Sequence, residues 1–140
     1  MRKIGILSVL LILSAVMFAQ NSPKTVQINY KNYEVLPYDL DGTYDWYEAK
    51  EACDKLVAFG KSDWFLPDKY ELDGLYKQKE KIGGFKNDEP SFSSSFRSVY
   101  WSSSDSYLIL GWFQSFLTGG QDTSYKTGFF NYSVRCIRKK

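Results

Sequence analysis

The feature that most constrains the fold of this chain is a single pair of cysteines. Its 140 residues contain only Cys53 and Cys136, which stand more than eighty positions apart. In an exported chain, an isolated pair of cysteines indicates first of all a disulfide. Such a bond requires the fold to bring a residue from the first half of the chain beside one near its C-terminus. By the loop-closure estimate, the crosslink restricts the unfolded chain by about 4 kcal/mol.

The N-terminal segment has the pattern of a secretory signal peptide. Arg2 and Lys3 precede an apolar run over residues 4–18, and the small residue Ala19 follows before the sequence becomes polar. The alternative is an uncleaved membrane anchor, but the run is shorter than the ~20 residues of a spanning helix. We therefore expect residues 1–19 to be removed and the mature protein to be secreted or periplasmic, at the cell envelope. We further expect a lead with short strands over residues 20–44 and one domain over residues 45–140.

The export prediction has a direct test. If the signal peptide is cleaved after Ala19, N-terminal sequencing of the exported protein should begin near Gln20. Protein that still carries Met1 and is found only in the cytoplasm would contradict the prediction.

Charge and composition narrow the classes of partner and of chemistry. The chain has 18 Lys and Arg against 16 Asp and Glu, and loss of Arg2 and Lys3 with the signal peptide leaves 16 against 16. A mature chain with no net charge has no overall field to attract nucleic acid, so we expect no nucleic-acid partner. The basic residues among 135–140 are interpreted as a solvated chain end. The chain has no histidine, which removes His-based catalytic triads and His-ligated metal sites.

The first half of the mature chain predicts two short strands and two helices. Residues 25–30 and 33–38 alternate as half-buried strands do, with a turn at Lys31-Asn32. Asp45 and Glu48 form a capping-box pattern ahead of a helix that we expect to end at Gly60. The apolar face of this helix contains Trp46, Ala49, Cys53, Leu56 and Val57. Asp68 and Glu71 repeat the capping pattern for a second helix, whose apolar face contains Leu72, Leu75 and Tyr76, and Gly83-Gly84 closes that segment.

The second half predicts a loop and antiparallel strands. Residues 87–97 are rich in Ser and Phe without periodicity, which indicates a long loop. The predicted strands are residues 99–103, 108–117, 127–130 and 133–138, with a hairpin turn over residues 118–121. Helices early and strands late predict an α+β domain.

Several motifs in one order resemble the Lcl C-terminal domain family of bacteria, long catalogued as a domain of unknown function. Its D-W-R-L-P-T-x-x-E-L signature is similar to residues 63–72, and its W-S-S-S segment to residues 101–104. Its closing V-R-C-V-R is similar to residues 134–138, and its W-x-x-A-x-x-x-C helix to residues 46–53. Trp112, Phe116 and Gly119 have its W, F and G spacing. Phe65 replaces the family's Arg, which loses any ion pair there, and Asp68 replaces a Thr that would also cap a helix.

The resemblance implies a C-type-lectin-like fold related to that of formylglycine-generating enzymes. In such a fold two helices accompany an antiparallel sheet and a long loop region, and one disulfide ties the first helix to the last strand. Cys53 and Cys136 occupy those two places, in agreement with the argument from cysteine number.

The sequence fits three kinds of chemistry poorly. A serine nucleophile would need a lysine base, since histidine is absent, and the Ser-rich part has no S-x-x-K spacing. Asp39, Asp41 and Asp45 around Gly42 are similar to a calcium loop but lack its late bidentate Glu, so a calcium-dependent lectin is less favoured. A copper site of the formylglycine-generating type would need the two thiols that the disulfide uses. We therefore expect no enzyme activity, no cofactor and no metal.

The remaining interpretation is an exported, non-catalytic binding module, with an extracellular glycan or protein as its ligand. Aromatic side chains mixed with amide and carboxylate groups suit sugars or peptides. The candidate ligand-binding residues are Asp105, Tyr107, Trp112, Gln114, Asp122 and Tyr125. The alternative that remains open is a purely structural envelope or scaffold protein with no small ligand.

Overall fold

The computed structural model describes residues 21–87, 97–128 and 130–140. The predicted signal peptide therefore lies outside the described residues, as does most of the predicted loop over residues 87–97. No helix in the described part of the chain is long and apolar enough to cross a membrane.

Within these ranges three helices and six strands form the domain. The strands are β1 (Lys24–Ile28), β2 (Lys31–Val35), β3 (Val99–Tyr107), β4 (Leu110–Ser115), β5 (Gln121–Tyr125) and β6 (Ile137–Lys139). The helices are α2 (Trp46–Asp54), α3 (Lys69–Lys77) and the short α4 (Lys79–Ile82). The α+β class is therefore confirmed, with one helix more than predicted.

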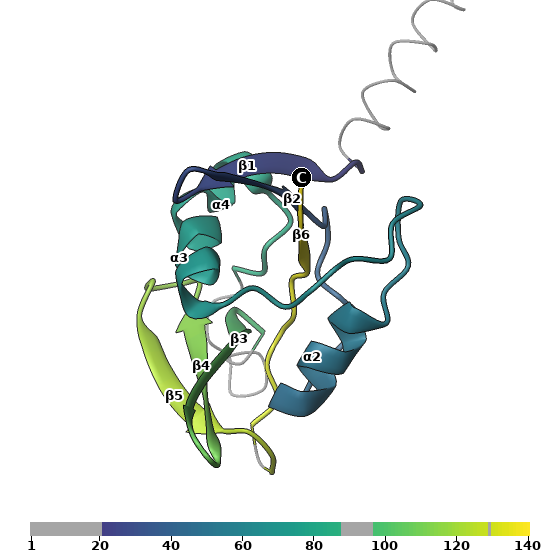
Figure 1. Ribbon diagram of the computed structural model, residues 1–140. Helices are drawn as coiled ribbons and strands as arrows, with labels where there is room; N and C mark the ends of the chain where they lie inside the picture. Colours follow the sequence, from purple (N-terminus) through teal and green to yellow (C-terminus); the bar gives the residue numbers. More distant parts are fainter. Residues whose placement is uncertain (1–20, 88–96, 129) are drawn as a thin grey trace, which may run out of the picture.

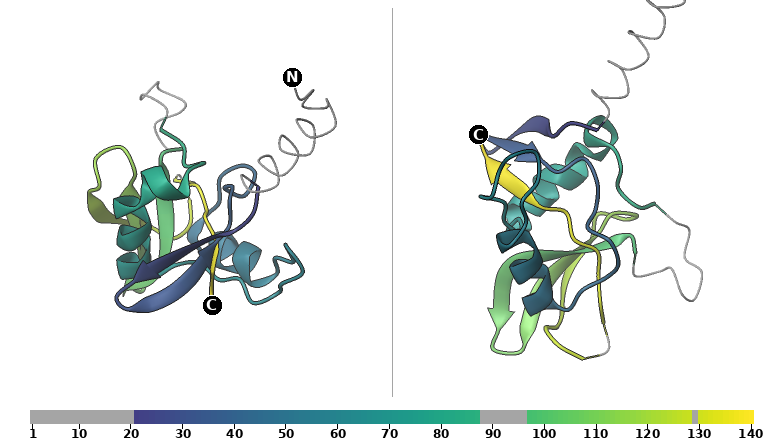
Figure 2. Two further views of the ribbon diagram at one scale, coloured as in Figure 1. Left: turned by 90° about the horizontal axis from the view of Figure 1, so that it is seen from above. Right: turned by 90° about the vertical axis from the view of Figure 1, so that its right-hand side faces the viewer.

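The strands form two antiparallel three-stranded sheets, where one sheet was predicted. The first has the order β1-β2-β6 and the second the order β3-β4-β5. The two sheets lie at opposite ends of the molecule (Figure 1). Helix α3 lies along the second sheet and also reaches β1, while α2 contacts β3 (Figure 2). Because β6 lies near the C-terminus and pairs with the N-terminal hairpin, both ends of the domain contribute strands to one sheet.

Two hydrophobic clusters form the core. The first lies between the first sheet, α3 and α4, and includes Val35, Leu72, Leu75, Tyr100 and Phe116. The second surrounds α2 and is formed by Leu36, Trp46, Ala49, Cys53, Trp64, Leu66, Trp101, Tyr132, Val134 and Cys136. The core is rich in aromatic side chains, and three of the four tryptophans are buried in it.

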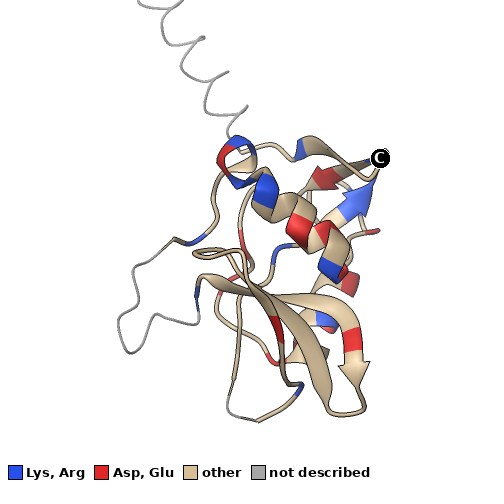
Figure 3. Cartoon of the chain, turned by 90° about the vertical axis from the view of Figure 1, so that its left-hand side faces the viewer, with Lys and Arg blue, Asp and Glu red and all other residues tan. Residues whose placement is uncertain are grey.

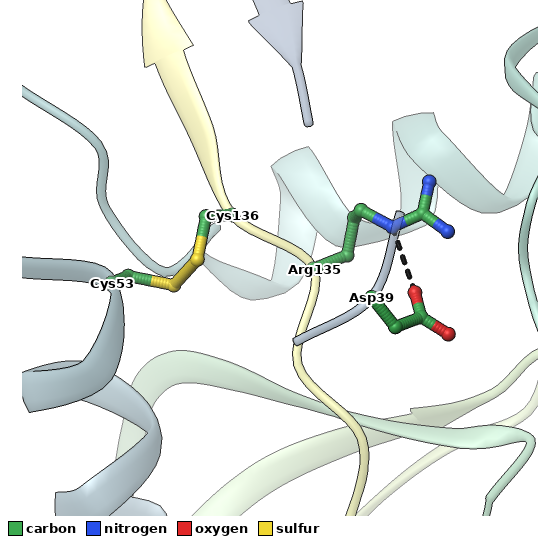
Figure 4. The surroundings of a disulfide bond; sticks show 4 residues. All are labelled: Asp39, Cys53, Arg135 and Cys136. Atoms are coloured by element: carbon green, nitrogen blue, oxygen red, sulfur yellow. Dashed lines mark hydrogen bonds and ion pairs between the residues drawn. A yellow bond between two sulfur atoms is a disulfide. The ribbon is translucent and has the colours of Figure 1, made fainter. Parts of the chain in front are cut away.

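The disulfide predicted from the sequence joins this second cluster to the C-terminal segment. Cys53 in α2 is bonded to Cys136, which immediately precedes β6. Both cysteines are fully buried. Figure 4 shows that Cys136 and its neighbour Arg135 point to opposite sides of the chain, so that one enters the α2 cluster and the other turns away from it.

Both capping boxes are confirmed, but the end of the first helix was predicted wrongly. The Asp45 carboxylate accepts from the backbone N–H of Glu48, and Asp68 accepts from that of Glu71. Helix α2 ends at Asp54 rather than at Gly60, and Val57 is 74% exposed. Residues 55–57 leave the helix because Ala58 and Lys61 pair across a tight turn instead.

The strand boundaries needed three corrections. The first hairpin turns at Asn29-Tyr30, both with positive φ, and not at Lys31-Asn32. The third strand of the second sheet is β5, because residues 121–125 pair with β4. Of the strand predicted over residues 127–130, the described residues 127, 128 and 130 belong to no strand. Most of the predicted strand over residues 133–138 is held by single bridges and backbone hydrogen bonds, and only β6 is regular. The turn over residues 118–121 is confirmed in place, because it links β4 to β5.

Candidate functional site

The six residues predicted to bind a ligand all belong to the second sheet, but they do not share one surface. Residues directly opposite one another in an antiparallel pair point to the same face. Trp112 pairs with Thr123, Gln114 with Gln121, and Leu110 with Tyr125. Phe113 pairs with Asp122 and therefore lies on the opposite face. The alternation thus separates Trp112, Gln114 and Tyr125 from Asp122.

The face that contains Trp112 and Gln114 is the one that faces α3. The Gln114 side chain donates to the Asp73 carboxylate at 2.9 Å, and Gln121 donates to the backbone carbonyl of Lys69 at 2.7 Å. Gln114 is fully buried and also donates to the carbonyl of Gly119. Its amide therefore ties the sheet to α3 and to the β4–β5 turn, and it does not face a ligand as the sequence analysis expected.

The two acidic residues of the predicted set lie away from this face. Phe113 packs on Trp101 and Tyr132 in the second cluster, so its partner Asp122 shares the face that points toward α2. Asp105 forms an ion pair with Lys126, whose ammonium group lies 4.4 Å from the centroid of the Trp46 ring. Neither carboxylate joins the aromatic side chains on the α3 side.

Beyond the first turn of α3, the uncovered part of the sheet presents a group of aromatic side chains. Tyr107, Leu110 and Tyr125 form one cross-strand row over β3, β4 and β5. Tyr107 is 70% exposed and Tyr125 is 56% exposed. Trp112 follows on β4 and is half-buried. Figure 3 looks at this side of the molecule, where the sheet extends past α3 with few charged residues on it.

The start of α3 contributes two residues that the sequence analysis missed. The Lys69 ammonium group lies 4.1 Å from the centroid of the Trp112 ring and 5.1 Å from that of Tyr70. Tyr70 is 65% exposed and therefore widens the surface around Trp112. We refer to Tyr70, Tyr107, Trp112 and Tyr125 as the aromatic platform. The helical period of α3 marks Tyr70 only as an exposed residue, so no sequence signal connected it with Trp112.

Hydrogen bonds at the helix start fix the position of Lys69 and Tyr70. The Asp68 carboxylate accepts from the backbone N–H of Tyr70 at 2.9 Å. The backbone N–H of Lys69 donates to the Ser104 hydroxyl of β3 at 2.9 Å. The capping residue and the Ser-rich segment therefore hold the start of α3 against the sheet, which sets the position of one edge of the platform.

A buried group of polar side chains around Arg135 has the features of a structural network. The Arg135 guanidinium donates to Asp39 at 2.7 Å, and the two side chains are 0% and 4% exposed. Arg135 also donates to the carbonyls of Leu36 and Gly83. The hydroxyl of Tyr100 donates to the same carboxylate at 2.6 Å. Arg135 was expected in a solvated chain end, and the structure corrects this because the guanidinium is buried among these partners.

Burial also sets the protonation state of Tyr100. Desolvation, followed by the negative charge and the hydrogen bond of Asp39, raises the pKa of the Tyr100 hydroxyl far above its ordinary value. The phenol therefore stays protonated and acts as a donor to the carboxylate. A phenol that stays protonated and donates to a buried carboxylate fits a structural role better than acid–base chemistry.

Two of the three carboxylates that resemble a calcium loop have other partners. Asp39 pairs with Arg135, and Asp45 caps α2. Across the described residues, no three Cys, Asp or Glu side chains form a group able to hold a metal ion.

Fold and site together define a small disulfide-bonded α+β domain with an open aromatic surface. The family model of the Lcl C-terminal domain matches residues 19–138, so the chain belongs to that family. The match begins well before the segment 46–138 on which the resemblance rested, and it includes β1 and β2. No curated protein matches the chain.

Proposed function

We propose that this protein is an exported, non-catalytic binding module, and that the aromatic platform takes up an extracellular glycan. The observation that carries the proposal is the group of exposed rings on the part of the second sheet that α3 leaves uncovered. Large apolar side chains that gather on one exposed face mark an interaction site more often than single exposed ones do.

The chemistry of the platform suits a sugar. A sugar ring has one face of C–H groups, which packs on an aromatic ring, and a rim of hydroxyls that needs polar partners. The hydroxyls of the three platform tyrosines can donate and accept, and the Lys69 ammonium group between Tyr70 and Trp112 adds a donor. Tyrosine also adds contact area at low cost in side-chain entropy.

Three described serines have structural roles, which favours binding over catalysis. The buried Ser102 hydroxyl donates to the carbonyl of Trp112, and the buried Ser133 hydroxyl donates to that of Arg97. The Ser104 hydroxyl accepts from the start of α3. These three hydroxyls form hydrogen bonds within the fold, and the chain has no histidine to activate a serine.

Two further parts of the proposal concern fold relationship and location. The bond between a helical cysteine and one beside the last strand supports a C-type-lectin-like fold, in which ligands bind beside the loop-bearing sheet. The same bond supports an oxidising location outside the cytoplasm, secreted or periplasmic.

Exchange of two platform tyrosines tests the proposal. A glycan array on the folded domain should first identify a bound sugar. The variants Tyr70→Ala and Tyr125→Ala should then weaken its binding about tenfold or more each, since each removes a stacking ring. Their side chains are mostly exposed, so thermal unfolding should change little. Isothermal titration calorimetry measures the affinities.

A matched control is available at the other end of the molecule. Tyr30 is 96% exposed at the tip of the first hairpin, and Tyr30→Ala should leave glycan affinity unchanged. Affinity that survives in both platform variants would move the site elsewhere. An array that retains no glycan at all would favour the purely structural scaffold.

A further inference from the structure

The turn between β3 and β4 has an unusual composition. Tyr107 pairs with Leu110, so Leu108 and Ile109 are the two turn residues. Leu108 is 82% exposed and Ile109 is 58% exposed. Two-residue hairpin turns favour Gly, Asn or Asp, which tolerate positive φ. In the described chain, positive φ outside glycine is confined to Asn29, Tyr30 and Phe59, so this turn follows a different geometry. Neither solvation nor turn geometry explains two branched aliphatic residues here.

The turn is held from inside by one buried residue. The Lys126 ammonium group donates to the carbonyl of Leu108 at 3.3 Å. The backbone N–H of Lys126 donates to the carbonyl of Ile109 at 2.9 Å. Lys126 is 6% exposed, and Asp105 balances its charge. Both turn carbonyls therefore have partners, and the side chains of Leu108 and Ile109 project from a fixed support. A backbone carbonyl that already has a partner costs less to move into a medium without water than one that has none.

We propose that this hairpin tip inserts Leu108 and Ile109 into the apolar layer of a lipid membrane. Tyr107 and Tyr125 lie in the row just behind the turn, where amphipathic rings suit the level of the lipid headgroups. The tip lies at the end of the molecule opposite the C-terminus and the first sheet (Figures 1 and 2). Insertion therefore leaves the rest of the domain in water.

Shape and size favour lipid over a protein partner. The tip is a protrusion with four large side chains, whereas a stable protein interface uses about 20 residues on each side. Two hollows among the described residues would not suit the tip of a second copy of the chain. Both are lined largely by polar and charged side chains, such as Lys79, Glu80 and Lys86 in one and Asp73, Lys77 and Gln78 in the other. A fluid lipid layer adapts to a small convex tip without a preformed groove.

Vesicle partition tests the proposal independently of glycan binding, because the vesicles contain no sugar. We would use the chain from residue 20 onward, which retains both sheets, both core clusters and the disulfide. The probe is a vesicle of zwitterionic phosphatidylcholine, with vesicles containing anionic phosphatidylglycerol as a second arm. Binding should occur to both and should persist at high salt, because apolar insertion does not depend on charge.

The variant Leu108→Ser/Ile109→Ser should reduce partition at least about tenfold, since each exchange removes an aliphatic side chain that would enter the lipid. The control Val57→Ser alters an equally exposed aliphatic residue in the loop after α2 and should partition as the wild type does. Far-ultraviolet circular dichroism and thermal unfolding should be the same for all three proteins. Three results would overturn the proposal: no binding to phosphatidylcholine, binding only to anionic vesicles at low salt, or unchanged partition of the double variant.

Discussion

Replacing Asp39 with asparagine should lower the free energy of unfolding by about 3–5 kcal/mol, because it leaves the Arg135 charge buried without a counter-charge. The carboxylate is the only charged partner that the structure gives this guanidinium within the described residues. One nitrogen of Arg135 already lacks a hydrogen-bond partner there, so no spare acceptor is at hand to compensate. Tyr100 also loses a charged acceptor for its hydroxyl. Urea unfolding followed by tryptophan fluorescence measures the change.

The chain provides a matched control for this prediction. Asp63 also pairs with an arginine, Arg138, at 2.7 Å, but its side chain is 58% exposed. Asp63→Asn should therefore lower the free energy of unfolding much less than Asp39→Asn does, because solvent screens an exposed ion pair. The double variant Asp39→Leu/Arg135→Met removes both buried charges and should be more stable than Asp39→Asn. Equal losses for Asp39→Asn and Asp63→Asn would show that burial does not govern the Asp39–Arg135 pair.

The sequence was most informative where the determining interactions are local. Both capping boxes close over three residues, so Asp45 and Asp68 could be recognised without any knowledge of the fold. The disulfide was predictable for a different reason, since two cysteines allow only one intramolecular pairing. Arg135 was misinterpreted because Asp39 lies 96 positions away along the chain, and only the folded chain brings the two together.

The candidate site was also hard to predict wherever it depends on residues far apart in the sequence. Its location on the second sheet followed from composition, but its faces depend on register, and register was not readable from residues 108–130. Because residues 121–125 form the third strand, Asp122 lies on the sheet face opposite to that of Trp112. Tyr70 joins the platform because its neighbour Lys69 donates to Ser104 of β3, which lies 35 positions from Lys69 along the chain. Aromatic content therefore predicted that rings would be exposed on this sheet, while the residues that make up the platform depended on tertiary contacts.

The disulfide is expected to stabilise the domain mainly through the unfolded state. Cys53 and Cys136 are 83 positions apart, and closing a loop of that length restricts the unfolded chain by about 4.5 kcal/mol. Cys53→Ala/Cys136→Ala should lower the free energy of unfolding by up to about that amount, because structure that remains in the unfolded chain reduces the effect of the crosslink. The large aromatic clusters around both positions should keep the native fold intact.

The slope of urea unfolding separates this mechanism from simple loss of packing. Without the crosslink, the unfolded chain expands and exposes more surface, so the m-value should rise while the midpoint falls. Peptide mapping of non-reduced wild-type protein should recover one linked pair of cysteine peptides. Cys53→Ser/Cys136→Ser, whose side chains are close in size to the thiols, serves as a second variant and should show the same rise in m-value. A fall in midpoint with an unchanged m-value in both variants would assign the stabilisation to contacts in the folded state instead of to the restricted unfolded chain.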